Sequence, residues 1–428
     1  MRTLWPLALA AAIPASLVAC KSDSPPPQHL DVTVSWNDTR QNIEGFGASS
    51  AFFGQTITED VADQLFDAKK GIGLSLLRIM IGVPADTDNS ALAAEPETGA
   101  NPVATSPELY TAQQAYVRGA RVWATAWTPP PIWKEHNSKL GSQTDSTVGT
   151  VFKTNKLVSS HYGDYANYLA DFVDLMAKNS VPLMGVSPAN EPDYVASWDG
   201  AQWSPDELTT FIGQNMGPTF AKCCASVKII TPDTASWPNV DSYVTPLLAD
   251  SAAKNYLSVV ATHPYQNGSA AIDLNYSKPR DNGKEFWETE WSQENSKGDT
   301  PDPTMKSAID LMNHLHDHLT GANMNAWSWW AAYITANDLR NGDKPKIRQN
   351  PALIQPIHPD TDDPPVMFKR GYAFAHWSKF VRPGFLRLGA TDHPNPGVLV
   401  EAYRDSDSHI ALTAINTSGS KVTQKFLR

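Results

Sequence analysis

Cysteine is scarce in this sequence: three of its 428 residues are cysteine, at positions 20, 223 and 224. Cys223 and Cys224 are adjacent, and neighbouring residues do not readily reach the Cα separation of an ordinary disulfide. We therefore expect both side chains to be structural and the fold to lack disulfides. The histidines are scattered without the spacing of metal ligands, so we also expect no metal site.

Positive charge is also in short supply, and the formal net charge is −11. An acidic protein does not attract nucleic acid or an anionic membrane surface by charge. The sequence has no glycine-rich phosphate loop and no serine nucleophile elbow. The sequence therefore does not indicate a nucleic-acid-binding protein, a nucleotide-binding enzyme with a phosphate loop or a serine hydrolase. We expect neither a nucleic-acid partner nor a cofactor.

What the sequence does contain is apolar and aromatic. Hydrophobic residues make up 41% of the chain, enough for an ordinary globular core. The length suits a large barrel with an accessory domain, and we expect a monomer. Fourteen Trp and thirteen Tyr are many; most of them should lie in the core, but flat rings also stack on the faces of sugars.

The N-terminus reads as an export signal over residues 1–19: Met1-Arg2 is basic, and Leu4 to Ala19 is apolar and too short to span a membrane. Its end, Leu17-Val18-Ala19-Cys20, resembles the bacterial lipoprotein cleavage box. The resemblance implies a lipid anchor at Cys20, a stiff tether over residues 20–30, and an outer-membrane or cell-surface location. The alternative is a plain signal with a chance cysteine, for a secreted or periplasmic protein.

Residues 41–382 alternate apolar strands with amphipathic helices, which is typical of parallel βαβ units. About eight such units form a (β/α)₈ barrel, the TIM barrel. The expected helices include 60–70, 162–178, 205–215 and 304–319. The expected strands are 43–48, 75–81, 121–126, 183–189, 227–231, 257–262, 285–291 and 324–330.

The flanking segments have a different pattern. Residues 31–40 and several stretches within 383–428 alternate with period two, as half-buried antiparallel strands do. We expect one N-terminal strand and the C-terminal strands to pack together as a small β-sandwich beside the barrel. The fold class is therefore α/β, a barrel with a side sandwich.

Two glutamates occupy the ends of expected barrel strands: Glu191, after Ser187-Pro188-Ala189-Asn190, and Glu290, after Trp287-Glu288-Thr289. Active sites of such barrels lie at the carboxyl ends of the strands. Cleavage of a glycosidic bond needs two carboxyl groups, one to protonate the leaving oxygen and one to attack the anomeric carbon or activate water. A single glutamate is usually a solvated surface residue, but two at one barrel mouth indicate a glycosidase.

Six stretches in order along the chain resemble glycoside hydrolase family 30, a family of retaining glycosidases built on this barrel and sandwich. They are Glu44-Gly45-Phe46-Gly47, Leu77-Arg78-Ile79, Thr125-Ala126-Trp127-Thr128-Pro129-Pro130, Asn190-Glu191-Pro192-Asp193-Tyr194, Trp287-Glu288-Thr289-Glu290-Trp291-Ser292 and Ser378-Lys379-Phe380-Val381-Arg382-Pro383-Gly384. In that family the sandwich normally continues beyond the point where this chain ends. We therefore expect an incomplete sandwich, with an unpaired edge or an exposed apolar face near residues 421–427.

The resemblance implies roles for the matching residues. Glu191 would be the general acid/base and Glu290 the nucleophile, with their carboxyl groups about 5–5.5 Å apart. Asn190 would bind the 2-hydroxyl of the sugar. Arg78 would keep Glu290 ionised, because a nearby cation lowers the pKa of a carboxylate; the alternative for Arg78 is a surface ion pair.

Four further residues are implied as substrate ligands. Trp127 and Trp330 would flank the bound sugar, although either could simply pack in the barrel core. His263 and Tyr265 would hydrogen-bond the substrate or a catalytic glutamate, although a lone histidine is as often structural.

The substrate implied is a β-linked plant cell-wall polysaccharide. Residues 187–203 are similar to the bacterial xylanases of the family, which favours an endo-acting β-1,4-xylanase. Relatives that depend on glucuronic acid branches carry an arginine directly after strand eight and a tyrosine after strand seven, and this chain has neither. The alternatives are a β-1,6-galactanase, a β-1,6-glucanase or a β-glucosidase, and, in another class, a surface lipoprotein that binds glycans without cleaving them.

Glu288 departs from the apolar or amide residue usual two positions before the nucleophile. Residues two apart in a strand face the same side, so we expect Glu288 to point into the barrel, either protonated or paired with a cation, Arg78 first. The alternative is a bulge that turns Glu288 to solvent.

Overall fold

The computed structural model describes residues 29–52, 56–83, 91–93, 103–147, 149–265, 272–292, 304–335, 340–341, 344–345, 352–358 and 364–427. The expected signal peptide, with Cys20, and most of the tether lie outside these residues. No helix in the described ranges is both long and apolar enough to cross a membrane.

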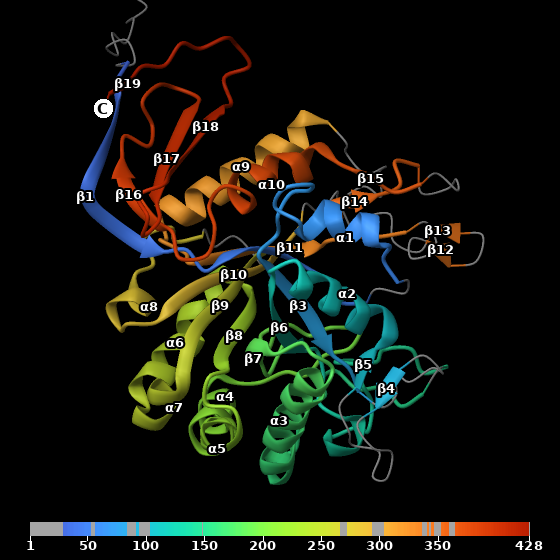
Figure 1. Cartoon of the computed structure of the whole chain (residues 1–428). Helices are drawn as coiled ribbons and strands as arrows, with labels where there is room; N and C mark the ends of the chain where they lie inside the picture. The colour runs from blue at the N-terminus through green and yellow to red at the C-terminus, as the bar shows by residue number, and fades with distance from the viewer. Residues whose placement is uncertain are drawn as a thin grey trace, which may run out of the picture.

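Eight parallel strands close into a barrel, as expected from the alternating pattern (Figure 1). In chain order they are β2 (Gly45–Ser49), β3 (Leu76–Ile81), β6 (Arg121–Ala126), β7 (Leu183–Ser187), β8 (Lys228–Ser236), β9 (Leu257–Tyr265), β10 (Glu285–Trp291) and β11 (Ala326–Ala331). Each strand pairs with the next, and β11 pairs with β2 to close the ring. All eight expected strands are present, with ends shifted by a few residues.

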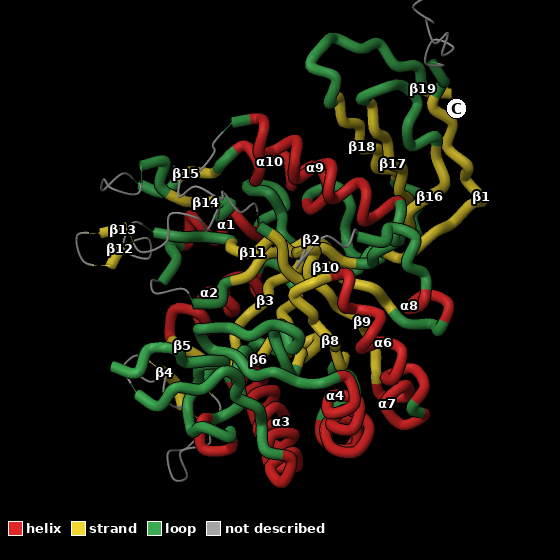
Figure 2. The backbone as a smooth tube through the Cα atoms, turned by 180° about the vertical axis from the view of Figure 1, so that it is seen from behind, coloured by secondary structure: helices red, strands yellow, loops and turns green. Residues whose placement is uncertain are grey.

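Helices surround the barrel, as the view from behind shows (Figure 2). They are α1 (Glu59–Phe66), α2 (Ser106–Val117), α3 (Tyr162–Lys178), α4 (Pro205–Phe211), α5 (Gly217–Cys223), α6 (Val240–Ala249), α7 (Ser251–Tyr256), α8 (Lys278–Asp281), α9 (Met305–Thr320) and α10 (Lys369–Ser378). The helix expected over 205–215 is α4, which starts at a capping box formed by Ser204 and Glu207 and runs on through a π-turn (Ile212–Met216) into α5.

Three two-stranded antiparallel sheets are also described. They pair β4 (Ala91–Ala93) with β5 (Val103–Thr105), β12 (Arg340–Asn341) with β13 (Lys344–Pro345), and β14 (Ile354–Gln355) with β15 (Val366–Met367).

Strand β2 needs its glycines because it lies very close to β3. A Cβ atom on Gly47 would come within 2.5 Å of the Leu76 carbonyl oxygen, and Gly45 has a φ of +145° that side chains rarely allow. The motif Gly45-Phe46-Gly47 thus lets the first and second barrel strands approach each other.

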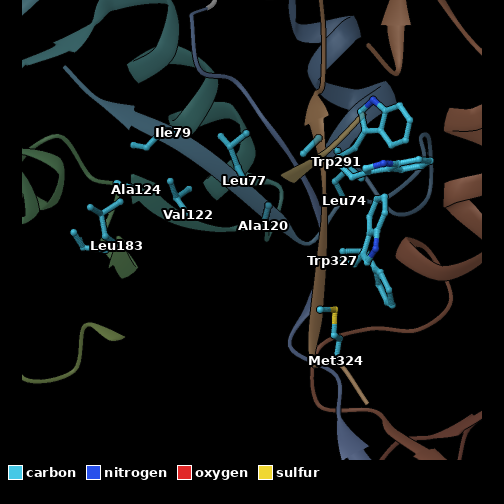
Figure 3. Close-up of a cluster of buried hydrophobic side chains, with 14 of the residues drawn as sticks. Leu74, Leu77, Ile79, Ala120, Val122, Ala124, Leu183, Trp291, Met324 and Trp327 are labelled. Carbon is cyan, nitrogen blue, oxygen red and sulfur yellow. The ribbon is translucent and has the colours of Figure 1, made fainter. Parts of the chain in front are cut away.

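Two hydrophobic clusters fill the barrel and its surroundings. The interior cluster is formed by Leu76, Trp123, Ile230, Val259, Ala261, Trp287 and Ala326. A larger cluster fills the layer between the strands and the helices, where Trp291 and Trp327 pack edge to face with ring centroids 6.0 Å apart (Figure 3). The inside of the barrel is therefore packed, and only its mouth is free for a ligand.

The flanking strands form one mixed sheet of five, ordered β18-β17-β16-β1-β19, beside the barrel (Figure 1). They are β1 (Val32–Asn42), β16 (Leu386–Ala390), β17 (Val398–Arg404), β18 (Ile410–Asn416) and β19 (Phe426–Leu427). The N-terminal strand pairs with C-terminal strands, as expected. A second sheet layer is not among the elements that the structure describes.

The expected open edge and exposed apolar side chains are present in this sheet. Strand β19 pairs with β1 on one side and ends the sheet order. The side chains of Ile410, Leu412, Phe426 and Leu427 are all exposed.

A buried polar cluster joins the sheet to the barrel. Glu401, in β17, is buried and accepts hydrogen bonds from Trp377 Nε1 at 2.8 Å and from the Tyr403 hydroxyl, and it contacts His316 Nδ1, in α9, at 3.0 Å. The carboxylate thus has a partner at each oxygen, which offsets the cost of burying it.

The expectation of a fold without disulfides is wrong at one place. Cys223 and Cys224 are joined by a disulfide, with their Cα atoms 3.8 Å apart. Helix α5 ends at Cys223, and Cys224 has left the helical conformation, with φ −151° and ψ 48°. The change of backbone direction between two adjacent residues brings their sulfur atoms together, which the argument from an ordinary disulfide did not allow for.

Candidate active site

The polar residues expected at the barrel mouth come together there. Glu191 and Asn190 follow β7. Tyr265 is the last residue of β9 and Glu290 the last but one of β10, and Arg78 lies in the middle of β3. In parallel strands the carboxyl ends meet at one end of the barrel, so four separate stretches of sequence contribute to one cluster.

Glu290 is nearly buried and has two direct partners. Its Oε2 accepts a short hydrogen bond from Arg78 Nη1, and its Oε1 lies 3.3 Å from the Tyr265 hydroxyl. The pKa of Glu290 is raised overall, because burial and the neighbouring Glu191 raise it more than His263 and Arg78 lower it. The two cations therefore favour the ionised carboxylate against the cost of burying it.

Arg78 is completely buried, so the alternative of a surface ion pair is excluded. Its second amino group donates to Asn190 Oδ1 at 2.7 Å, and its Nε donates to Thr125 Oγ1 at 3.2 Å. The guanidinium lies 4.6 Å from the ring centroid of Trp127, a cation–π distance. These contacts fix the plane of the guanidinium and, with it, the direction of Glu290.

Glu191 is held in an unusual backbone conformation, with φ +53°. Its N–H donates to the Asp233 carbonyl at 2.9 Å, and its Oε1 lies 3.0 Å from His263 Nδ1. A positive φ in a residue with a side chain costs about 1 kcal/mol or more and persists where the surroundings impose it, often at functional sites.

The two carboxyl groups are close neighbours at the barrel mouth. One oxygen of Glu191, one oxygen of Glu290 and one nitrogen of His263 all lie within 4.8 Å of one another. Retaining glycosidases hold their carboxyl groups about 5–5.5 Å apart, and inverting enzymes about 6.5–9.5 Å apart. The nearest oxygens of the two glutamates are thus closer together than the carboxyl groups of inverting enzymes.

Aromatic rings form a wall on the Arg78 side of this cluster. Trp127 is buried and Trp330 partly buried, with ring centroids 6.0 Å apart. A third ring, Phe52, follows β2 and packs edge to face on Trp127 at 5.3 Å, while 46% of its own surface is exposed. The sequence motifs did not single out Phe52.

Sequence reasoning also missed Asp233, which is fully buried in β8 beside Arg78 and His263. A signal was available, because Asp233 follows the expected strand 227–231 closely, as Glu191 follows 183–189.

Glu288 does not behave as expected. Its neighbours on β10 face the barrel interior: Trp287 belongs to the interior cluster, and Thr289 donates to Asp233 Oδ1 at 2.5 Å. Alternation therefore places Glu288 on the helix-facing side of the strand. The pairing of β10 with β11 shifts register between Glu288 and Trp291, and this bulge lets Glu290 reach the site although it is two residues from Glu288.

The expected pairing with Arg78 and the alternative of exposure are both wrong, whereas the expected protonated state agrees with the raised pKa of this buried carboxyl group. Arg78 is not its partner, because both amino groups of Arg78 are taken by other residues of the site. Nor does the bulge expose Glu288, which has no solvent-accessible surface. Its Oε2 accepts from the Ser328 N–H at 3.3 Å, and its Oε1 has no hydrogen-bond partner among the described residues. Burial raises the pKa of Glu288 well above its usual range, which favours the neutral carboxyl group.

A neutral buried Glu288 makes stability depend on pH. In the unfolded chain the side chain ionises near pH 4.5, whereas in the folded protein it stays protonated to a higher pH. Its contribution to stability is therefore complete below about pH 4.5 and is lost as pH rises toward the folded pKa. We expect Glu288→Gln and wild type to unfold at nearly the same temperature at pH 4.5. Above pH 4.5 the variant should unfold at a higher temperature than wild type, because its free energy of unfolding exceeds that of wild type by up to about 1.4 kcal/mol more for each pH unit.

Thermal unfolding of both proteins from pH 4.5 to 8 measures this difference. Glu59→Gln, the same change at an exposed residue of α1, is the control and should give a difference that does not grow with pH. A difference between Glu288→Gln and wild type that stays constant over this range would show that Glu288 is ionised in the folded protein.

Two neighbouring carboxyl groups at the mouth of a (β/α)₈ barrel are what cleavage of a glycosidic bond requires. Residues 104–381 match the glycosyl hydrolase family 30 TIM-barrel domain. The chain belongs to glycoside hydrolase family 30 and is a glycosidase that acts with retention.

Individual relatives agree with this assignment. The chain is 30% identical over 399 residues to glucuronoxylanase XynC of Bacillus subtilis, a match that covers 93% of this chain and 80% of the relative. The crystal structure of a family 30 subfamily 8 xylanase from Clostridium acetobutylicum is 28% identical, with a TM-score of 0.71 over 92% of this chain and 86% of the other. An endo-β1,6-glucanase shares the fold, with a TM-score of 0.72 at 22% identity over 92% and 89% of the two chains.

Proposed function

We propose that Glu290 is the nucleophile and Glu191 the general acid/base of this hydrolase. In the first step a carboxylate oxygen of Glu290 attacks the anomeric carbon, the glycosidic bond breaks, and the leaving oxygen takes the proton of Glu191. In the second step Glu191 takes a proton from water, the water oxygen attacks the anomeric carbon, and the ester bond to Glu290 breaks. The observation that carries the assignment is the contact of Arg78 with Glu290 and of His263 with Glu191, at carboxylates within 4.8 Å of each other.

We propose that the substrate is xylan and that the enzyme cleaves it internally as an endo-β-1,4-xylanase. Support comes from two relatives, the glucuronoxylanase at 30% identity and the subfamily 8 xylanase at 28% identity. Further support is the similarity of residues 187–203, which follow β7 and carry Glu191, to bacterial xylanases.

We further propose that cleavage does not require a glucuronic acid branch. A carboxylate on the substrate is best held by an arginine, which binds it through two parallel hydrogen bonds. The segment after β11, Ala331 to Thr335, contains no arginine, and neither Trp291 nor Ser292 after β10 is the tyrosine of branch-dependent relatives.

Product analysis on four polymers tests the substrate. On xylan and glucuronoxylan we expect similar rates, differing by less than about tenfold, because a charged hydrogen bond to a branch is worth roughly that factor or more. On β-1,6-galactan and β-1,6-glucan we expect no release of sugars. Faster cleavage of β-1,6-glucan than of xylan would show that the enzyme is a β-1,6-glucanase instead. A strong preference for the decorated xylan would show that a cation reaches the branch.

Phe52 is expected to bind the sugar chain at the outer end of the aromatic wall. It has a φ of +63°, which is rare for a bulky residue, and its ring is half exposed against Trp127. The fold therefore tolerates both backbone strain and an exposed ring at the mouth of the site, a combination that function explains better than stability.

Replacing Phe52 by glycine removes the backbone strain and the exposed ring, and with them any contact of the ring with the sugar. Glycine adopts a positive φ freely, so Phe52→Gly should be more stable than Phe52→Ala by about 1 kcal/mol. Both variants should raise KM for xylo-oligosaccharides by about two- to tenfold, the value of one aromatic contact. Phe380→Ala, an exposed phenylalanine beside the segment that precedes β3 at the other end of the barrel, is the control. An unchanged KM in Phe52→Gly would mean that the ring does not touch substrate.

A further inference from the structure

Asp233 occupies the centre of the site and contacts both of its cationic groups. Its carboxylate is fully buried, with Oδ2 3.2 Å from Arg78 Nη2 and Oδ1 3.3 Å from His263 Nε2. Its backbone, with φ +63°, accepts the Glu191 N–H at 2.9 Å. Burial alone would raise the pKa of Asp233, but Arg78 and His263 bring it well below its usual range, so that the residue is an anion throughout.

Two uncharged residues complete the surroundings of Asp233. The Ser187 hydroxyl donates to Oδ2 at 2.9 Å, and the Thr289 hydroxyl donates to Oδ1 at 2.5 Å. The carboxylate therefore has a hydrogen-bond donor at each oxygen besides its ionic contacts, which is what a buried anion needs to remain in place.

His263 lies between three carboxylates. Its Nδ1 is 3.0 Å from Glu191 and 4.0 Å from Glu290, and its Nε2 faces Asp233. A ring with carboxylate oxygens beside both nitrogens is stabilised as the imidazolium. Burial alone would lower the pKa of His263, but Glu290, Asp233 and Glu191 raise it to about 10. The other charged or titratable groups near the ring are Arg78, Glu288 and Tyr265.

We propose that Asp233 is a positioning residue whose fixed negative charge allows Arg78 and His263 to face the catalytic pair as two permanent cations. The argument rests on the proposed roles of Glu191 and Glu290. In the free enzyme the two cations face Asp233 and Glu290, and the general-acid role proposed for Glu191 requires it to enter the first step as the carboxylic acid.

The balance persists through the reaction. When Glu290 becomes an ester it loses its charge, and Glu191, which has given its proton to the leaving oxygen, becomes the second anion. One negative charge thus moves from Glu290 to Glu191, and His263 lies close enough to meet it at both places. The buried cluster never carries an uncompensated charge, which would be strongly unfavourable there.

Asp233→Asn tests the proposal, because asparagine keeps the size and one acceptor oxygen, for Ser187 or for Thr289, but removes the charge. We expect the ring of His263, followed by NMR and assigned by its loss in His263→Asn, to stay protonated from pH 5 to 8 in the wild type and to titrate within that range in Asp233→Asn. We expect kcat to fall by about 10- to 100-fold, the value of a charged hydrogen bond. Asp233→Glu should restore the protonated ring.

Ser187→Ala and Thr289→Val are matched controls, since each removes one neutral donor to Asp233 and leaves every charge in place. Their His263 titration should follow the wild type. If Asp233→Asn folds with a wild-type unfolding temperature and its His263 titrates as in the wild type, the proposal is overturned. The titration is read without turnover, so this failure is distinct from a failure of the roles assigned to Glu191 and Glu290.

Discussion

Glu290→Ala is expected to lose hydrolysis almost completely, with kcat lower by on the order of 10⁴-fold or more, as for removal of other catalytic nucleophiles. The loss should be equally severe for xylan and for an aryl xyloside with a good leaving group. Attack on the anomeric carbon forms the first bond in both cases, and a better leaving group cannot replace it.

Azide makes this test specific to the nucleophile. The shorter side chain leaves space below the anomeric carbon, and azide entering there attacks from the side that Glu290 occupies. The product should be the α-glycosyl azide, with inverted configuration, identified by NMR. Glu59→Ala, at an exposed residue of α1, should behave as wild type and form no azide. Formation of the β-glycosyl azide by Glu290→Ala would remove Glu290 from the nucleophile role.

Glu191→Ala is expected to have an effect that depends on the leaving group. General acid catalysis contributes about 10²- to 10⁴-fold, and xylan, whose leaving sugar hydroxyl needs protonation, should lose all of it. An aryl xyloside with an acidic phenol needs no protonation, so its first step should remain fast. The second step then lacks a base, and the ester on Glu290 should accumulate, detected as a mass increase of one glycosyl unit.

The same anion distinguishes Glu191 from Glu290. Azide needs no general base, so it should restore turnover of the aryl xyloside by Glu191→Ala. It attacks the ester from the opposite side to Glu290, and the product should therefore be the β-glycosyl azide. Equal losses on xylan and on the aryl xyloside, or an α-azide product, would exclude Glu191 as the acid/base.

The barrel and its two glutamates could be predicted because the relevant information is local. A parallel strand buried on both faces is a short apolar run, and each of the eight runs is visible by itself. Glu191 comes two residues after the expected strand 183–189, and Glu290 is the last residue but one of the expected strand 285–291. Both are therefore at the carboxyl ends of strands, which meet at one end of a barrel. The closure of the ring then follows from the number of units.

The surroundings of Asp233 could not be predicted, because they depend on how the strands are offset from one another. Its partners come from β3, β7, β9 and β10, and no periodicity within one strand reports those offsets. Glu288 was misplaced for a related reason. Its position was inferred from regular alternation up to Glu290, and one bulge in the pairing of β10 with β11 was enough to put the two residues on different sides.

The pairing of β1 with the C-terminal strands has a consequence for how the chain folds. Thr33 and Thr391, which bond through their hydroxyls at the β1–β16 junction, are 358 positions apart in the sequence. Contacts of such long range form late, because the loop they close must first be brought together. Until β16 is available, β1 has no neighbour and is an open strand edge of the kind that pairs with other chains. Aggregation during synthesis should therefore depend on the time for which β1 stays unpaired before the C-terminal strands are made, more than on the rate at which the barrel folds.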